Sequence, residues 1–176
     1  MRYNTVRVGF VLVLLMAAND SEGKRVSAAS SQNPVACAVT TPNGVVASGG
    51  DKDPNSYGNR QVSVGPFGLW PDGTVVFKPG GAGFITRDGS LGMKFGWLRG
   101  VPGQLRIDGR RLDAPASPLR AEVSNGYGTL GFQATYVIFP TPGCWEITGR
   151  VGDASVTFVT MVVKIGDGPA WRRDVP

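Results

Sequence analysis

Apolar and polar residues alternate along the last part of the chain, which is the pattern of a β-strand with one buried face. In residues 145–151, every second residue is apolar or glycine, and Glu, Thr and Arg stand between them. Successive side chains of a strand point to opposite faces, so this segment predicts a strand with one solvated side. Residues 155–165 carry apolar side chains on both faces, and Gly152-Asp153 separates the two segments. We therefore predict a hairpin whose second strand is central in its sheet or covered on both sides.

Short segments of β type recur along the chain between turn signals. The candidate strands are residues 61–69, 74–78, 83–86, 91–98, 104–108, 119–123, 130–139, 145–151 and 155–165. Asp-Gly pairs, which accept positive φ angles at low cost, stand between several of them. The chain has 26 glycines and 13 prolines, and it shows no long helical periodicity after its N-terminal stretch. Short strands separated by Gly and Pro turns indicate an all-β fold, and the final hairpin favours a sandwich over a barrel.

The N-terminus has the layout of a secretory signal. Arg2 and Arg7 precede an apolar stretch at residues 8–18, which is shorter than the roughly 20 residues that a membrane-spanning helix needs. We therefore expect a cleavable signal peptide and leader in residues 1–29, no integral span in the mature chain, and a protein that is secreted or held at the cell envelope. Lipid anchoring at Cys37 is the alternative, but this cysteine lies far beyond the apolar stretch.

The remaining chain divides by composition. Residues 30–59 are rich in Ser, Ala, Asn, Gly and Pro, and we expect a flexible N-terminal arm there. Residues 60–166 contain the predicted strands of the β-sandwich domain, and residues 167–176 form a C-terminal tail. Removal of the leader leaves about 147 residues, a length that suits one domain with a sizeable core.

Cysteine use agrees with export. Cys37 and Cys144 are the two cysteines of the chain. Paired thiols persist in the oxidising environment that an exported chain meets, so we predict a structural disulfide between them. This bond would join the beginning of the mature protein to the next-to-last strand.

The segment that begins the final hairpin carries a family resemblance. Pro142-Gly143-Cys144-Trp145-Glu146 resembles the Pro-Gly-x-Tyr-x-Val start of the next-to-last strand in immunoglobulin-like sandwiches, with Trp145 in place of the tyrosine. Together with Leu-Trp-Pro-Asp-Gly-Thr-Val-Val-Phe at 69–77, it is similar to secreted bacterial proteins of this fold for which no activity is established. The resemblance implies an immunoglobulin-like antiparallel β-sandwich in an extracytoplasmic location, and it implies no reaction.

Composition narrows the possible chemistry. The chain contains no histidine, so histidine-activated nucleophiles and His-ligated zinc or copper lack an indispensable part. Asp51-Lys52-Asp53 begins like a calcium loop, but Ser56 and Val62 stand where such a loop needs its glycine and its glutamate. No basic run is interleaved with aromatic residues, which disfavours nucleic acid as a partner. We expect no metal, no cofactor and no catalytic residue.

Aromatic residues are the remaining candidates for ligand contact. Tyr57 lies in the polar arm, Trp97 and Arg99 stand at the end of a predicted strand, and Tyr127 is flanked by two glycines. These residues are our speculative binding set. Tryptophans of a small sandwich usually belong to the core, so Trp70, Trp97 and Trp145 are first expected there, and Tyr127 is the ring with the strongest claim to exposure.

The leading hypothesis is an exported, non-catalytic binding or interaction module, monomeric, with an unknown protein or saccharide as its ligand. Two alternatives stay open. The first is a secreted hydrolase that uses paired carboxylates, one with a raised pKa. The second is an inhibitor of an extracytoplasmic protease, whose exposed loop at residues 112–119 would enter the cleft of the protease.

Overall fold

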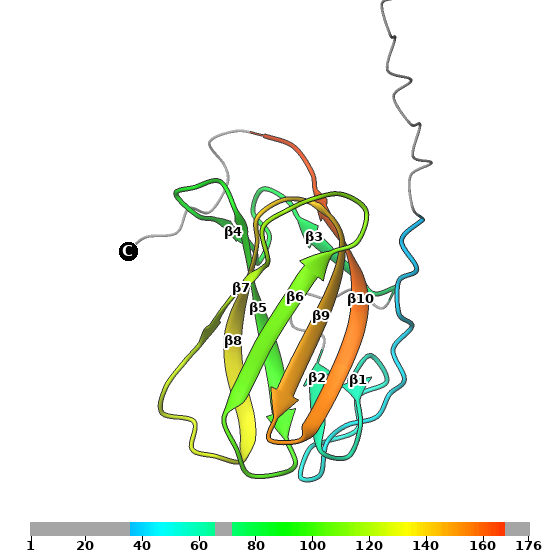
Figure 1. The fold of residues 1–176 in the computed structure, drawn as a ribbon, viewed down its shortest axis with the longest axis vertical. Coiled ribbons are helices and arrows are strands. Elements are labelled where there is room, and N and C mark those ends of the chain that lie inside the picture. The colour runs from blue at the N-terminus through cyan, green and yellow to red at the C-terminus, as the bar shows by residue number, and fades with distance from the viewer. Residues whose placement is uncertain (1–35, 66–71, 168–176) are drawn as a thin grey trace, which may run out of the picture. The chain divides into compact units, whose positions relative to one another are not determined.

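The computed structural model describes residues 36–65 and 72–167, which belong to a compact unit that spans Asn33–Pro176. The described residues form two β-sheets packed as a sandwich, without a helix (Figure 1). The predicted all-β sandwich is therefore confirmed. Among the described residues, no helix could span a membrane. The signal peptide predicted for residues 1–29, Trp70 and nearly all of the predicted tail lie outside the described residues.

Ten strands in the described part of the chain make up the two sheets. The larger sheet has six strands. Five of them follow the order β1-β2-β5-β8-β7, and β4 also pairs with β5. Their bounds are β1 (Tyr57–Gly58), β2 (Val62–Gly65), β4 (Phe84–Ile85), β5 (Leu91–Arg99), β7 (Arg120–Val123) and β8 (Gly131–Phe139). The smaller sheet has four in the order β3-β10-β9-β6: β3 (Thr74–Phe77), β6 (Leu105–Arg111), β9 (Gly143–Val151) and β10 (Ala154–Lys164).

The strand order is that of an immunoglobulin sandwich. Taken in chain order, β2, β5, β6, β7, β8, β9 and β10 correspond to strands A to G. The neighbours β2-β5-β8-β7 then reproduce the ABED sheet, and β6-β9-β10 reproduce the CFG sheet. The short strands β1, β3 and β4 are additions to this plan.

One pairing departs from the predicted antiparallel arrangement. β3 runs parallel to β10, in a register from Thr74 opposite Met161 to Phe77 opposite Lys164, whereas the other pairs among the described strands are antiparallel. Strands joined by a tight turn must run antiparallel, but a long stretch of chain separates β3 from β10 and leaves their relative direction free. The sequence pattern therefore contained no signal for this pair.

The final hairpin has the predicted form. β9 and β10 pair from Val151 opposite Ala154 to Gly143 opposite Val162, and Gly152 takes a φ of 56° in the turn. The apolar face of β9 is buried, with Trp145 and Ile147 fully inaccessible to solvent. β9 lies between β10 and β6 in the smaller sheet, and its apolar face forms part of the core.

Tryptophans fill the space between the sheets. Trp97 and Trp145 are both 0% exposed, which confirms their predicted core position. Gly149 of β9 lies directly beneath the indole of Trp97, because a Cβ atom built at this position would stand 2.1 Å from the indole Cζ3. The glycine thus leaves room for the largest side chain of the opposing sheet.

The predicted flexible arm, residues 30–59, is hydrogen-bonded to the sandwich over its described part. The Thr40 amide donates to the Val159 carbonyl at 2.9 Å, and the Val159 amide donates to Thr40 Oγ1 at 2.8 Å. The side-chain amide of Asn43 donates to the Gly58 carbonyl at 2.8 Å and accepts from the Gly58 amide at 3.1 Å. The polar composition that suggested flexibility instead supplies side chains that satisfy backbone groups.

Candidate binding surface

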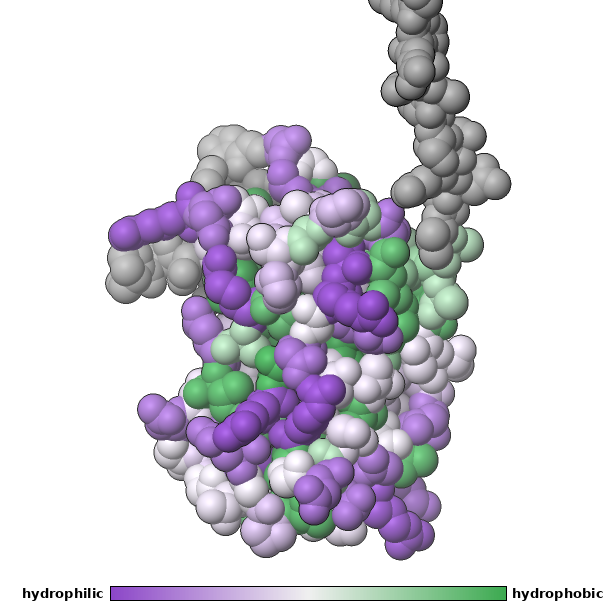
Figure 2. Space-filling model, in the orientation of Figure 1, coloured by the Kyte–Doolittle hydropathy of each residue, from purple (hydrophilic) through white to green (hydrophobic). Residues whose placement is uncertain are grey.

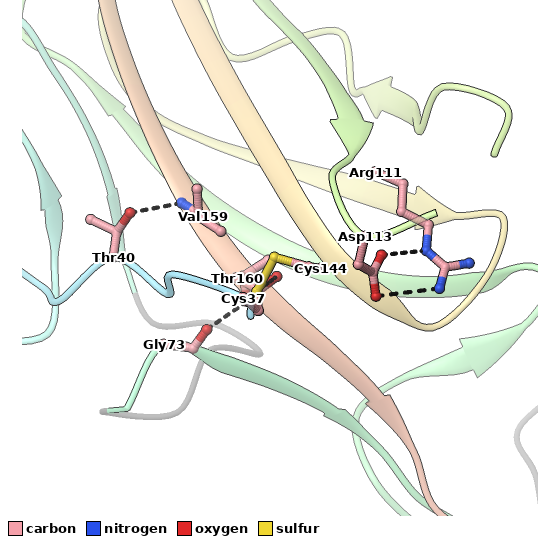
Figure 3. The surroundings of a disulfide bond; sticks show 8 residues. All are labelled: Cys37, Thr40, Gly73, Arg111, Asp113, Cys144, Val159 and Thr160. Carbon is pink, nitrogen blue, oxygen red and sulfur yellow. Dashed lines mark hydrogen bonds and ion pairs between the residues drawn. A yellow bond between two sulfur atoms is a disulfide. The ribbon is translucent and has the colours of Figure 1, made fainter. Parts of the chain in front are cut away.

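The disulfide fastens the arm to the smaller sheet. Cys37 and Cys144 are bonded, with their Cα atoms 5.5 Å apart, which confirms the predicted pair (Figure 3). Beside the bond, Thr160 Oγ1 donates to the Gly73 carbonyl at 2.6 Å and so connects β10 to the turn before β3. A disulfide is consistent with an oxidising, extracytoplasmic location. In the structure both cysteine sulfurs are committed to this bond.

A buried arginine organises the loop between β7 and β8. Arg99 ends β5 with 1% of its surface exposed, and its partners are backbone carbonyl oxygens. Nη1 donates to Gly103 and Gly128, and Nη2 donates to Tyr127, each at 3.0 Å. Longer bonds of 3.4 Å reach the carbonyls of Gly131 and Leu130. The five N–H groups of a guanidinium are thereby all used, and no described carboxylate pairs with this cation.

Glycines allow the loop to turn its carbonyls toward Arg99. Gly126, Gly128 and Gly131 have φ angles of 91°, 65° and 84°, a region that other residues adopt at a cost. The Gly103 amide also donates to the Thr129 carbonyl at 2.9 Å, which joins this loop to the turn between β5 and β6. The glycines with positive φ angles and the Arg99 guanidinium together hold residues 124–131 in a fixed shape.

The loop and the start of β8 present apolar side chains to solvent. Tyr127, Leu130 and Phe132 are 38%, 54% and 46% exposed, and we call these three residues the aromatic patch. The rings of Tyr127 and Phe132 meet edge to face, with centroids 6.0 Å apart. The aromatic patch contains three of the five large hydrophobic residues that are exposed in the described part of the chain. Clustered exposure of this kind marks an interaction surface more often than isolated apolar residues do.

A groove adjoins the aromatic patch and shares Phe132 with it. The groove has a volume of about 520 Å³ and lies against the arm and the face of β2 and β5 that points away from the core. Gly65 and Gly96, which pair directly across β2 and β5, leave its floor without side chains. Its apolar walls and polar rim come from Val46, Leu98, Phe132, Ser56, Ser63, Asp51, Lys52 and Asp53.

The opposite sheet offers a different surface. Figure 2 shows hydrophilic residues gathered over β6 and β9. Arg110 pairs with Glu146 at 2.9 Å, and Arg150 pairs with Asp108, so opposite charges from neighbouring strands alternate there. Exposed pairs of this kind are well solvated and contribute little to stability. The apolar candidates for binding therefore lie on the larger sheet and its loop.

The predicted ligand-binding residues fall into two groups. The exposed ring expected of Tyr127 is present. Arg99 is 1% exposed and its donors are used by backbone carbonyls, so its predicted role as a ligand contact is wrong. Tyr57 and Trp97 are 2% and 0% exposed, so the idea that their rings form an open stacking platform is also wrong. The Tyr57 ring stacks on Phe158 with centroids 4.9 Å apart. Burial, followed by the negative charge of Asp72, raises the pKa of the Tyr57 phenol.

Sequence reasoning missed Leu130 and Phe132, although the start of β8 carried a signal. Phe132 is exposed, whereas the polar residues Gln133 and Thr135 are 6% and 1% exposed. Gln133 is held by a bond from its side-chain amide to the Ser124 carbonyl at 2.9 Å. The usual alternation of apolar inside and polar outside is thus inverted here, and an inversion of this kind points to function.

The carboxyl groups with a shifted pKa do not form an acid–base pair. Hydrogen bonds from Arg120 and Thr86 hold the pKa of Asp88 far below its ordinary value, and Arg111 lowers the pKa of Asp113. A general acid of a carboxylate hydrolase needs a shift in the other direction. Within residues 36–65 and 72–167, His, Cys, Asp and Glu side chains form no group of three that could hold a metal ion.

Comparisons with protein-family models, with curated proteins and with solved structures give no match to this chain. The resemblance to secreted bacterial immunoglobulin-like proteins therefore stays a prediction. The evidence on function comes from the geometry of the chain itself.

Proposed function

We propose that this chain is an exported, non-catalytic immunoglobulin-like module that binds another protein through the aromatic patch. One observation carries the proposal: a loop that exposes Tyr127 and Leu130 is held rigid from beneath by Arg99. Aromatic side chains dominate the binding energy of protein interfaces. A loop that is already ordered loses little conformational entropy when it binds, so its contacts contribute more fully to affinity.

Export is part of the proposal. The secretory layout of the N-terminus and the disulfide between Cys37 and Cys144 both support an oxidising compartment outside the cytoplasm. N-terminal sequencing of protein recovered from the extracytoplasmic fraction of producing cells tests this part. Recovery of the intact chain, still reduced, from the cytoplasm would overturn it.

The binding surface can be tested by site-specific cross-linking in cells that produce the protein. A photoreactive phenylalanine analogue placed at position 127 should yield a discrete adduct with one protein. The same analogue at Thr157, an exposed position on the smaller sheet, is the matched control and should yield none. Leu130→Asp should abolish the adduct from position 127 without lowering the amount of folded protein. Adducts of equal yield from both positions, or no loss with Leu130→Asp, would contradict the proposal.

Catalysis provides a second and independent test. Purified protein should not turn over polysaccharide, peptide or ester substrates. Turnover that disappears on substitution of an acidic residue, such as Asp51 or Asp53 of the groove, would replace a binding module with a hydrolase.

Protease inhibition is a second candidate function, because residues 112–119 are fixed at both ends. The Leu112 amide donates to the Cys144 carbonyl at 2.8 Å, and the Leu119 amide donates to the Gly109 carbonyl at 3.3 Å. Residues 115–118 between these points are exposed. A panel of serine proteases incubated with equimolar protein tests this function. Inhibition that is lost on substitution within 115–118 would support it, whereas simple cleavage of the loop would dismiss it.

A further inference from the structure

The groove beside the aromatic patch combines an uncompensated carboxylate with aliphatic walls. Asp53 Oδ1 accepts a hydrogen bond from the Asn55 amide at 3.0 Å, whereas no described residue bonds to Oδ2. This second oxygen lies over the groove floor, 3.7 Å from the position that a Cβ atom of Gly65 would occupy. The fold thus uses one oxygen of Asp53 to shape the turn and leaves the other facing the groove.

The floor and walls of the groove fit a narrow aliphatic stem. Gly65 contributes no side chain, and among the described residues a Cβ atom built on it would be in van der Waals contact with Asp53 Oδ2 at 3.7 Å and with the Gly96 carbonyl oxygen at 3.8 Å, so the glycine leaves the floor bare beneath the carboxylate. Val46 and Leu98 meet above Gly50, where a Cβ atom would stand 2.6 Å from a Val46 methyl and 2.2 Å from a Leu98 methyl. Methylene groups pack well against aliphatic walls of this kind, while a charged end group seeks an anion.

The charge of the groove is opposite to that of the chain. Its charged lining residues are Asp51, Lys52 and Asp53, which give a formal balance of −1, whereas the whole chain carries +5. A local negative site on a positive protein attracts a cationic group. A neutral saccharide would gain nothing from this charge and would prefer a flat aromatic platform, which the glycine floor does not provide.

We propose that the groove receives an arginine or lysine side chain of the protein partner, with its aliphatic stem against the wall that Val46 and Leu98 form together and its cationic end on Asp53. The inference rests on the proposed function, because Phe132 belongs both to the groove and to the aromatic patch. The partner segment therefore carries a basic residue next to an apolar one. The apolar residue covers the patch, and the basic residue enters the groove.

The inference can be tested with a short peptide whose charge is changed without changing its shape. The probe is acetyl-Gly-Arg-Gly-amide, and its control contains citrulline, which has the same stem and a neutral end group. Titration of the isotope-labelled protein, followed by NMR, should show that the arginine peptide moves the amide signals of residues 49–53, 63–65 and 96–98. The citrulline peptide should leave these signals in place. Equal effects of both peptides, or shifts confined to other residues, would overturn the inference.

Four variants separate the effect of charge from the effect of shape. Asp53→Asn should weaken binding of the arginine peptide by about fivefold, the effect of losing one partly exposed ion pair. Asp153→Asn removes the same charge from the exposed turn between β9 and β10, outside the groove, and should change nothing. Gly65→Val adds methyl groups to the glycine floor beneath Asp53 and should block binding, while Gly65→Ala should bind with intermediate strength. Unchanged binding by Asp53→Asn would refute the inference even if Gly65→Val did not fold.

Cross-linking distinguishes a failure of this inference from a failure of the proposed function. If the adduct from position 127 persists in wild-type protein while the arginine peptide does not bind, the groove inference is wrong and the binding module stands. If the arginine peptide binds in the groove but position 127 gives no adduct, the groove inference holds and the patch is not the interface. A neutral trisaccharide, maltotriose, that moves the groove signals when the arginine peptide does not would also overturn the inference.

Discussion

Replacement of Arg99 by methionine tests whether this cation builds the loop. Methionine keeps a long unbranched stem but removes all five donors that Arg99 offers to backbone carbonyls. We expect the loop at residues 124–131 to lose its fixed shape and the domain to lose stability. Lysine is the informative comparison, because it restores the charge with three donors on a single nitrogen.

The magnitude follows from the bond lengths. Three bonds are 3.0 Å long and two are 3.4 Å, so only the shorter three are counted. At about 1.5 kcal/mol for each bond from a charged donor, they set an upper limit of about 4–5 kcal/mol. Two effects make the loss of stability smaller than this limit. The methionine variant has no cation to desolvate on folding, and the loop carbonyls can bind water instead of Arg99. We therefore expect a loss of about 2–3 kcal/mol for Arg99→Met, and Arg99→Lys should lose at least as much.

Urea unfolding and amide hydrogen exchange measure the two parts of this prediction. A loss of this size lowers the melting temperature of a domain of this length by about 5–10 °C. Exchange should accelerate at the Gly103 amide, which bonds to Thr129 of the loop. A wild-type urea midpoint for Arg99→Met would refute the structural role of the cation. Wild-type stability for Arg99→Lys would show that charge matters and that the five-donor geometry does not.

Three further predictions concern the disulfide, an ion pair and the core. Replacement of both Cys37 and Cys144 by alanine should lower the free energy of unfolding by up to about 4–5 kcal/mol, the chain-entropy value for a loop of about 100 residues, as read from a urea curve; an unchanged midpoint would contradict this. Because Arg111 lowers the pKa of Asp113 in the folded protein, this pair stabilises above the unfolded pKa of about 3.9 and is lost as the pH falls through the lower folded pKa. Asp113→Asn should therefore reduce the acid sensitivity of unfolding measured between pH 5 and 2, and an identical pH profile would argue against the pair. Gly149→Ala should destabilise the domain by about 1–3 kcal/mol, because the added methyl group overpacks against the Trp97 indole. An unchanged melting temperature would show that the core accommodates the methyl group without cost.

The sequence was sufficient where local pattern and packing agree. The alternation in residues 145–151 predicted β9 because one face of this strand meets the core, while Glu146 and Arg150 on the other face reach solvent. Gly152 marked the turn, and Cys37 and Cys144 offered one possible disulfide within the chain. Short-range rules of side-chain direction and turn geometry decide such features, so a single sequence contains them.

The candidate surface was less accessible to sequence reasoning because long-range contacts create it. Nothing near Arg99 in sequence indicates that the carbonyls of Tyr127 and Leu130 will surround its guanidinium. The burial of Tyr57 likewise depends on Phe158, which lies about 100 residues further along the chain and at the centre of β10. Pattern rules read neighbours along the chain, whereas these side chains are placed by sheet pairing between distant strands.

The position of the disulfide has a mechanical consequence. If the chain is pulled from a point before Cys37 and a point after Lys164, the cross-link carries the force directly to Cys144 in β9. Cys144 lies opposite Met161 in the antiparallel ladder with β10, so both ends of the load act at the same end of one strand pair. Such a load opens the ladder of hydrogen bonds one after another. The segment between the two cysteines, which are 107 residues apart, includes the aromatic patch and the groove and bears no tension. A protein that was tethered by its ends would therefore keep its candidate binding surface unstretched until β9 and β10 had separated.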